Sequence, residues 1–195
     1  MKIVGVGCCP GMLTESAIEI LRRAKKCYGS DRAIRIAEPY LQPDCICVTI
    51  TDFKNLRELR DKDVVILSTG DPMLGGLGDL KGEVVPGISS LQLACARLKI
   101  PWLKVVPLTA HGMEYKQVFH SIAEEIVRGK IVFLLADPEI DPRSLSLLLR
   151  EQEIFCDIAV CENLGYPGER IEVGSTVDPP GVNSSLFSLL LGHFR

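Results

Sequence analysis

The sequence has no long apolar run, no Cys-x-x-Cys pair and only three histidines among its 195 residues. Its longest apolar runs fall far short of the roughly 18 residues that cross a membrane. The amino terminus has no apolar core ahead of a small-residue cleavage site, so we expect no signal peptide and a cytoplasmic location. A net charge of −3 gives no overall attraction to nucleic acid or to anionic membranes.

The eight cysteines have no metal-binding pattern that the sequence alone can establish. Cys45 and Cys47 would face the same side of a strand, because alternate residues of a strand share a face. No second cysteine or histidine pair follows at the spacing of a zinc site. We therefore predict no metal, and we expect reduced cysteines that pack as small hydrophobic side chains.

Strand-like and helix-like segments alternate along the chain, which is typical of an α/β protein. The predicted strands are 2–6, 33–37, 46–50, 64–67, 83–85, 104–108, 131–135, 157–161, 171–173 and 186–191, the last of which could also be a helix. The predicted helices are 14–27, 54–60, 91–98, 114–127 and one that begins at residue 141. The pattern of strands and helices is interrupted at residues 100–102. We expect this point to divide the chain into an amino-terminal domain, 1–102, and a carboxy-terminal domain, 103–195.

Four loops at the carboxyl ends of predicted strands are candidates for ligand binding, because ligands of open α/β sheets bind there. They are residues 5–11, 68–78, 86–90 and 161–165. The second loop carries one carboxylate and no basic residue, and it lacks the Gly-Lys-Ser/Thr of a phosphate-binding loop. It suits an adenosyl group that bears an amino acid and a sulfonium. The alternative is a plain turn, in which Gly70 takes a positive φ and Asp71 caps the next helix.

The first loop approximates the Gly-x-Gly-x-x-Gly dinucleotide fingerprint. Gly5 and Gly7 fit, but Pro10 stands at the third glycine position. Glu38, after the predicted strand 33–37, would then be the acid that binds the ribose. A nucleotide-binding oxidoreductase therefore stays open as an alternative function.

Several blocks of the sequence resemble the tetrapyrrole methylase family of S-adenosylmethionine-dependent enzymes. Gly-Asp-Pro at 70–72 follows an apolar strand, and VPGISSLQLA follows at 85–94. LTAHG at 108–112 and ENLGYPGERI at 162–171 look like the branch that methylates C5 of a cobalt-precorrin. The resemblance runs nearly end to end. It departs in the first loop, where the family usually reads Gly-x-Gly-Pro-Gly and this chain displaces the proline and glycine to positions 10 and 11.

The resemblance implies two α/β domains with S-adenosylmethionine in the cleft between them and S-adenosylhomocysteine as the product. It implies a corrin-ring substrate in cobalamin biosynthesis, a homodimer and a separate decarboxylating C15-methyltransferase as pathway partner. The residues that it assigns to the cofactor are Gly70, Asp71, Leu74, Ser89, Ser90, Leu135, Ala136 and Leu164. Gly70, Asp71 and Leu74 would contact the methionine part of the cofactor. Ser89 and Ser90, at the amino end of a helix, would bind its carboxylate. Leu135, Ala136 and Leu164 would contact the adenine. Core packing is the alternative for Leu135 and Leu164.

Methyl transfer from a sulfonium needs aligned reactants more than a protein nucleophile. His111 is the candidate catalytic residue, as a group that accepts or relays a proton, with a purely structural histidine as the alternative. His120 and His193 receive no role. Basic residues at 22–26 and 32–35 could meet the carboxylates of the substrate or could form solvated helix ends. A methylase of another precorrin position and a non-catalytic sensor of the cofactor are further alternatives.

Overall fold

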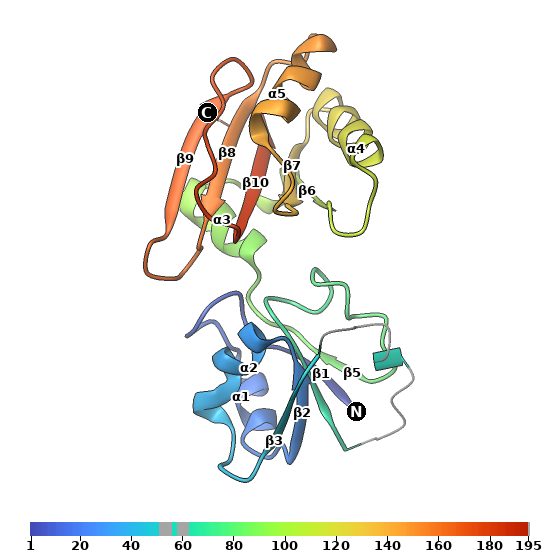
Figure 1. The fold of residues 1–195 in the computed structure, drawn as a ribbon, viewed down its shortest axis with the longest axis vertical. Coiled ribbons are helices and arrows are strands. Elements are labelled where there is room, and N and C mark those ends of the chain that lie inside the picture. Colours follow the sequence, from blue (N-terminus) through green and yellow to red (C-terminus); the bar gives the residue numbers. More distant parts are fainter. Residues whose placement is uncertain (51–55, 58–62, 195) are drawn as a thin grey trace. The chain divides into compact units, whose positions relative to one another are not determined.

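The protein consists of two compact units, residues Met1–Ser90 and Leu91–Arg195 (Figure 1). The structure is a computed structural model that describes residues 1–50, 56–57 and 63–194. The compact units divide at the start of helix α3 (Ser90–Leu98), whereas the sequence-based division at residue 102 falls after that helix. Where the functional domains divide stays a prediction.

The first unit contains a parallel sheet of five strands in the order β3-β2-β4-β1-β5. The strands are β1 (Lys2–Gly5), β2 (Lys26–Gly29), β3 (Ile46–Thr49), β4 (Val65–Ser68) and β5 (Glu83–Val85). Parallel strands need crossover connections, and helices α1 (Glu15–Leu21) and α2 (Asp31–Ala37) supply two of them. Every residue of β4 is buried, as expected for the central strand.

The two faces of this sheet have separate apolar cores because successive side chains of a strand point to opposite faces. Helices α1 and α2 lie on one side of the sheet (Figure 1), and Val4 and Leu67 pack with the apolar residues of those helices. Ile3 and Ile66 face the other way and pack with Leu56, Leu77 and Leu80. The sheet is therefore covered on both faces.

Two secondary-structure predictions in the first unit are wrong. Residues 33–37 are not a strand but part of α2, because Ser30 accepts a hydrogen bond from the Ala33 amide at 3.2 Å and caps a helix there. The predicted helix 14–27 ends at Leu21, and Lys26–Gly29 form β2 instead. The predicted helix 54–60 falls largely outside the described residues.

The second unit contains a mixed sheet of five strands in the order β6-β7-β10-β8-β9. The strands are β6 (Val105–Thr109), β7 (Ile131–Leu135), β8 (Asp157–Glu162), β9 (Arg170–Ser175) and β10 (Phe187–Gly192). Only the β6–β7 pair is parallel among its pairings within the described residues. These strands confirm the sequence predictions to within one or two residues, and the last apolar segment is a strand.

Helices α4 (Tyr115–Val127) and α5 (Pro142–Glu151) contribute to the core of the second unit. Asp141 caps α5 by accepting the amides of Arg143 and Ser144 at 3.2 and 3.1 Å, and Pro142 occupies the first helical position, as predicted. Across the described part of the chain, no helix combines the length and apolar character that a membrane span requires.

Candidate cofactor-binding site

Three of the predicted ligand-binding loops meet at one edge of the first sheet. Strands β4, β1 and β5 are neighbours and run parallel, so their carboxyl ends lie together. The amide of Gly70 donates to the carbonyl of Gly7 at 2.8 Å, and the reverse bond measures 3.3 Å. The amide of Cys8 donates to the carbonyl of Ile88 at 2.9 Å. Backbone hydrogen bonds therefore join all three loops.

Glycine is required where these loops approach each other most closely. A Cβ atom on Gly5 would lie 2.5 Å from the Gly87 nitrogen and 2.7 Å from the Gly70 oxygen. A Cβ atom on Gly87 would likewise overlap the Gly70 oxygen. Gly70 itself has a φ of +72°, which agrees with the positive φ expected from the sequence. The edge of the sheet is therefore lined by backbone rather than by side chains.

Asp71 ties the loop after β4 to the loop after β5. One carboxylate oxygen accepts the Met73 amide at 2.8 Å, and the other accepts the Gly87 amide at 3.1 Å. The residues that follow form turns, so Asp71 does not cap a helix. A carboxylate has about four acceptor positions, which leaves capacity for an amine donor of a ligand. Leu74 is half-buried in the same series of turns.

Ser89 and Ser90 lie beside Gly70, at the start of α3. Ser89 is buried, and its Cα atom would lie 3.6 Å from a Cβ on Gly70. Ser90 is the first residue of α3. The first amides of a helix have no acceptor within the helix, so this position suits the carboxylate of a ligand. The structure thus brings five of the predicted residues, Gly70, Asp71, Leu74, Ser89 and Ser90, into one region.

The displaced Pro10 and Gly11 of the first loop are exposed, whereas Cys9 is fully buried. The loop closes through a hydrogen bond from the Met12 amide to the Cys9 carbonyl at 3.3 Å. Glu38 begins a short 3₁₀ helix, η1 (Glu38–Tyr40), that directly continues α2. It does not follow a strand, so the geometry required for a ribose-binding acid is absent and the oxidoreductase interpretation loses its support.

The predicted residues of the second unit lie along one edge of its sheet. Leu135, the last residue of β7, pairs with Thr109 of β6 and with Ser188 of β10. Ala136 follows it and is buried. Leu164 is also buried, in the loop after β8. Because β10 separates β7 from β8, the strand that leads to Leu164 is about two strand spacings, or about 10 Å, from the strand that ends at Leu135.

His111 belongs to the same edge, in the loop after β6. Its backbone amide donates to the Thr109 hydroxyl at 3.2 Å. Its Nδ1 atom lies 3.5 Å from a carboxylate oxygen of Asp137, and its side chain is 57% exposed. The imidazole therefore lies beside a carboxylate and is open to a ligand, which suits a proton relay. Asp137 was not predicted from the sequence, although it directly follows Ala136.

The loop that carries Leu164 is held by a buried carboxylate, which the sequence analysis also missed. Glu162 is 1% exposed and accepts from Arg170 Nη1 at 2.8 Å, from the Ser184 amide at 2.8 Å and from the Asn183 amide. Burial raises the pKa of Glu162, but these hydrogen bonds outweigh it and hold the pKa below its usual value. Glu162 is thus charged and fully engaged within the protein.

Glu169 stabilises the carboxyl end of this loop through hydrogen bonds. It accepts from Arg97 Nε at 2.6 Å and from the Gly165 amide at 2.6 Å. The hydrogen bond from Arg97 lowers the pKa of Glu169 in spite of partial burial. Asn163 has a φ of +49°, which asparagine tolerates better than most residues. The block 162–171 therefore shapes the loop around Leu164.

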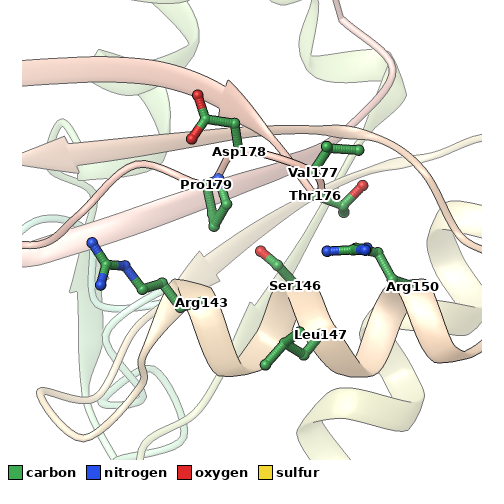
Figure 2. A pocket seen from close by; sticks show the side chains of 8 residues that line it. All are labelled: Arg143, Ser146, Leu147, Arg150, Thr176, Val177, Asp178 and Pro179. Carbon is green, nitrogen blue, oxygen red and sulfur yellow. The ribbon is translucent and has the colours of Figure 1, made fainter.

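A separate cavity of about 310 Å³ opens in the second unit beside α5 (Figure 2). Its lining residues are Arg143, Ser146, Leu147, Arg150, Thr176, Val177, Asp178 and Pro179. None of the residues predicted from the sequence for the cofactor lines this cavity, so it is not the candidate site.

Comparison with known proteins identifies the family of the chain. The family model described as Tetrapyrrole (Corrin/Porphyrin) Methylases matches residues 2–178. The chain belongs to this family. Both sheets belong to the tetrapyrrole methylase fold. The glycine-lined edge of the first sheet is therefore a candidate cofactor-binding site of a methylase.

Individual relatives agree with the family. A probable cobalt-precorrin-7 C(5)-methyltransferase from Methanocaldococcus jannaschii is 34% identical, over 89% of this chain and 88% of that protein. The crystal structure of a cobalamin-biosynthesis precorrin-6Y methylase from Archaeoglobus fulgidus is 28% identical, with a TM-score of 0.77 over 99% of this chain and 97% of that one. A uroporphyrin-III C-methyltransferase from Thermus thermophilus, solved with S-adenosylhomocysteine, is 21% identical, with a TM-score of 0.74 over 98% and 96% of the chains.

Proposed function

We propose that this chain is an S-adenosylmethionine-dependent methyltransferase that methylates C5 of cobalt-precorrin-7 in cobalamin biosynthesis. The observation that carries the proposal is the similarity, over nearly the whole of both chains, to the archaeal protein named for that reaction. The alternative within the family is methylation of another precorrin position.

The candidate site fits the methyl donor chemically. S-adenosylmethionine carries a sulfonium, an amine and a carboxylate, and its sulfonium supplies the methyl group. The loop 68–78 has no lysine or arginine to repel the sulfonium. We assign Gly70, Asp71 and Leu74 to the methionine part, with Asp71 accepting from the amine. We assign Ser89 and Ser90, at the start of α3, to the carboxylate of the cofactor.

In the second unit, we assign Leu135, Ala136 and Leu164 to the adenine. The contribution of the protein is alignment of donor and acceptor, which can lower the barrier by roughly 7–11 kcal/mol in favourable cases. We assign His111 to accept or relay the proton that the substrate loses, with Asp137 holding its imidazole.

The proposal includes the cellular setting that the family resemblance implies. We place the protein in the cytoplasm as a homodimer with a corrin-ring substrate. Because the archaeal relative is named for C5 alone, we propose that a separate decarboxylating C15-methyltransferase acts in the same pathway.

Replacing Asp71 with asparagine is expected to weaken S-adenosylhomocysteine binding by about 10- to 100-fold, which corresponds to one hydrogen bond to a charged group. Asparagine has one oxygen, so it can accept only one of the Met73 and Gly87 amides, and it removes the charge that faces the ligand amine. Isothermal titration calorimetry with S-adenosylhomocysteine, and with NAD for comparison, measures the effect. Asp79→Asn is the matched control, since Asp79 pairs with Arg57 at the surface.

Unchanged affinity in Asp71→Asn would remove Asp71 from the site. Binding of NAD in place of S-adenosylhomocysteine would overturn the proposed cofactor. The substrate is then tested by comparing turnover of cobalt-precorrin-7 with turnover of precorrins that are unmethylated at other ring positions. Methylation of a different carbon would favour the alternative within the family.

Replacing His111 with alanine is expected to lower kcat by about 10²- to 10⁴-fold, the usual contribution of a positioned acid or base. Affinity for S-adenosylhomocysteine should stay unchanged, because the imidazole faces the reacting proton in our assignment and not the cofactor. Single-turnover kinetics with the corrin substrate measures the loss. His120→Ala is the control, since His120 lies on the exposed side of α4, and equal activity of the two variants would exclude a catalytic role for His111.

A further inference from the structure

Three cysteine sulfurs gather at the β2–β3 border of the first unit. Cys27 of β2 and Cys47 of β3 are directly paired in the strand register, and their Sγ atoms are 3.1 Å apart. Cys45 precedes β3, and its Sγ atom completes a group in which all three sulfurs lie within 4.8 Å of one another. The sequence showed only the Cys45–Cys47 pair, because the third sulfur comes from a neighbouring strand.

The spacing of these sulfurs suits a shared metal ion. A zinc–thiolate bond of about 2.3 Å in tetrahedral geometry places its sulfurs about 3.8 Å apart. The cluster reaches that separation with shifts of under about 1 Å, within the freedom of cysteine rotamers. The Cys27–Cys47 separation of 3.1 Å is well beyond the roughly 2.05 Å of a disulfide bond.

The cluster also has a graded exposure that suits entry of an ion. Cys27 is buried, Cys45 is half-buried and Cys47 is exposed. The site therefore has an apolar floor, which excludes water from one side, and an open mouth. Strand β3 is an edge strand at the opposite side of the sheet from β5, so the cluster is distinct from the glycine-lined candidate site.

The cysteines are poorly suited to the role of reactive nucleophiles. Burial raises the pKa of Cys27, and the hydrogen bond with Cys47 and the charge of that residue add to the effect. Burial also raises the pKa of Cys45, with further contributions from Cys47 and Asp44. Reactive cysteines have lowered pKa values. The surroundings of these thiols therefore do not activate them as nucleophiles.

We propose that Cys27, Cys45 and Cys47 form a binding site for one thiophilic metal ion, zinc(II) or copper(I). Thiolates select these ions over harder cations. No fourth histidine, cysteine or carboxylate ligand joins the group in the described residues. A three-sulfur set of this kind holds copper(I) in trigonal geometry, or zinc(II) with a solvent molecule in the fourth position. Each thiol that binds releases its proton.

The test is a titration of the full, reduced chain with each ion under anaerobic conditions, in competition with a chromogenic chelator. We expect one ion per chain, and a loss of affinity of at least about 100-fold in Cys27→Ser and in Cys47→Ser. Cys8→Ser is the matched control, because Cys8 is a partly buried cysteine outside the cluster. Cys47 is exposed, so its serine variant should fold normally even where Cys27→Ser does not.

The two ions give separate outcomes within the proposal. Retention of copper(I) when both ions compete favours the trigonal site, and retention of zinc(II) favours the site completed by solvent. Absence of stoichiometric binding, or equal affinity in the wild type and the cluster variants, would overturn the proposal. A Cys27–Cys47 disulfide, detected by mass spectrometry of the non-reduced protein without metal uptake, would replace it with a redox pair.

Discussion

Replacing Gly5 with alanine is expected to lower the free energy of unfolding by about 3 kcal/mol and to abolish S-adenosylhomocysteine binding. The added Cβ atom would meet the Gly87 nitrogen at 2.5 Å and the Gly70 oxygen at 2.7 Å. Both are backbone atoms, so no side chain can move aside, and overpacking of this kind costs roughly 1–3 kcal/mol or more. The three loops of the candidate site would separate.

Gly76→Ala is the matched control for this variant. Gly76 lies in the loop after β4 with a φ of +77°, and a Cβ atom there would have no neighbour within 4 Å. Its substitution costs only the backbone strain, about 1–2 kcal/mol. Urea unfolding and calorimetry on both variants separate the two effects. If Gly5→Ala bound S-adenosylhomocysteine as Gly76→Ala does, the close approach of the loops would not be needed for the site.

The elements that sequence could predict are those with a continuous local pattern. Strands 64–67 and 131–135 are uninterrupted apolar runs, and both are interior strands of their sheets. The segment 33–37, AIRIA, is a short and mostly apolar run with two β-branched isoleucines, which resembles a short strand. Its true state depends on Ser30 and on burial of Ala33, Ile36 and Ala37 on one helical face. Helix and strand cannot be told apart in so short an apolar run, and the capping residue decides between them.

The candidate site likewise contains parts that the sequence could predict and parts that it could not. Its glycine-rich loops could be located because they follow recognisable strands, and parallel strands bring their carboxyl ends to one edge. The partners that orient the site could not be found, because they join distant segments. Glu162 meets the backbone of residues 183–184 because β10, the strand that follows them, pairs with β8. Asp71 meets Gly87 because β4 and β5 lie on either side of β1.

Replacing Glu162 with glutamine is expected to destabilise the protein by about 3 kcal/mol, the cost of removing one partner of a buried ion pair. One oxygen of Glu162 accepts the Asn183 and Ser184 amides, and the other accepts Arg170 Nη1. Glutamine can keep the backbone bonds, but its amide nitrogen would then face the guanidinium. Arg170 would be left with Glu172 and the Gly181 carbonyl as partners. Urea unfolding at neutral pH measures the loss.

The same substitution should change how stability depends on pH. The folded pKa of Glu162 is lower than that of an unfolded glutamate, which is about 4.3. Its ionised form therefore stabilises the protein fully above that value, and the contribution is lost as the pH falls through the folded pKa. The difference between wild type and Glu162→Gln should shrink as the solution is acidified below about pH 4.

Glu172→Gln provides the control for this network. Glu172 contacts the same guanidinium, but its side chain is 49% exposed, and exposed ion pairs contribute about 0–1 kcal/mol. We expect that variant to differ little from the wild type at any pH. Because Glu162 holds the loop that carries Leu164, Glu162→Gln should also weaken S-adenosylhomocysteine binding, whereas Glu172→Gln should not. If the two substitutions lowered the free energy of unfolding equally, burial of the Glu162 carboxylate would add nothing to the strength of its ion pair with Arg170.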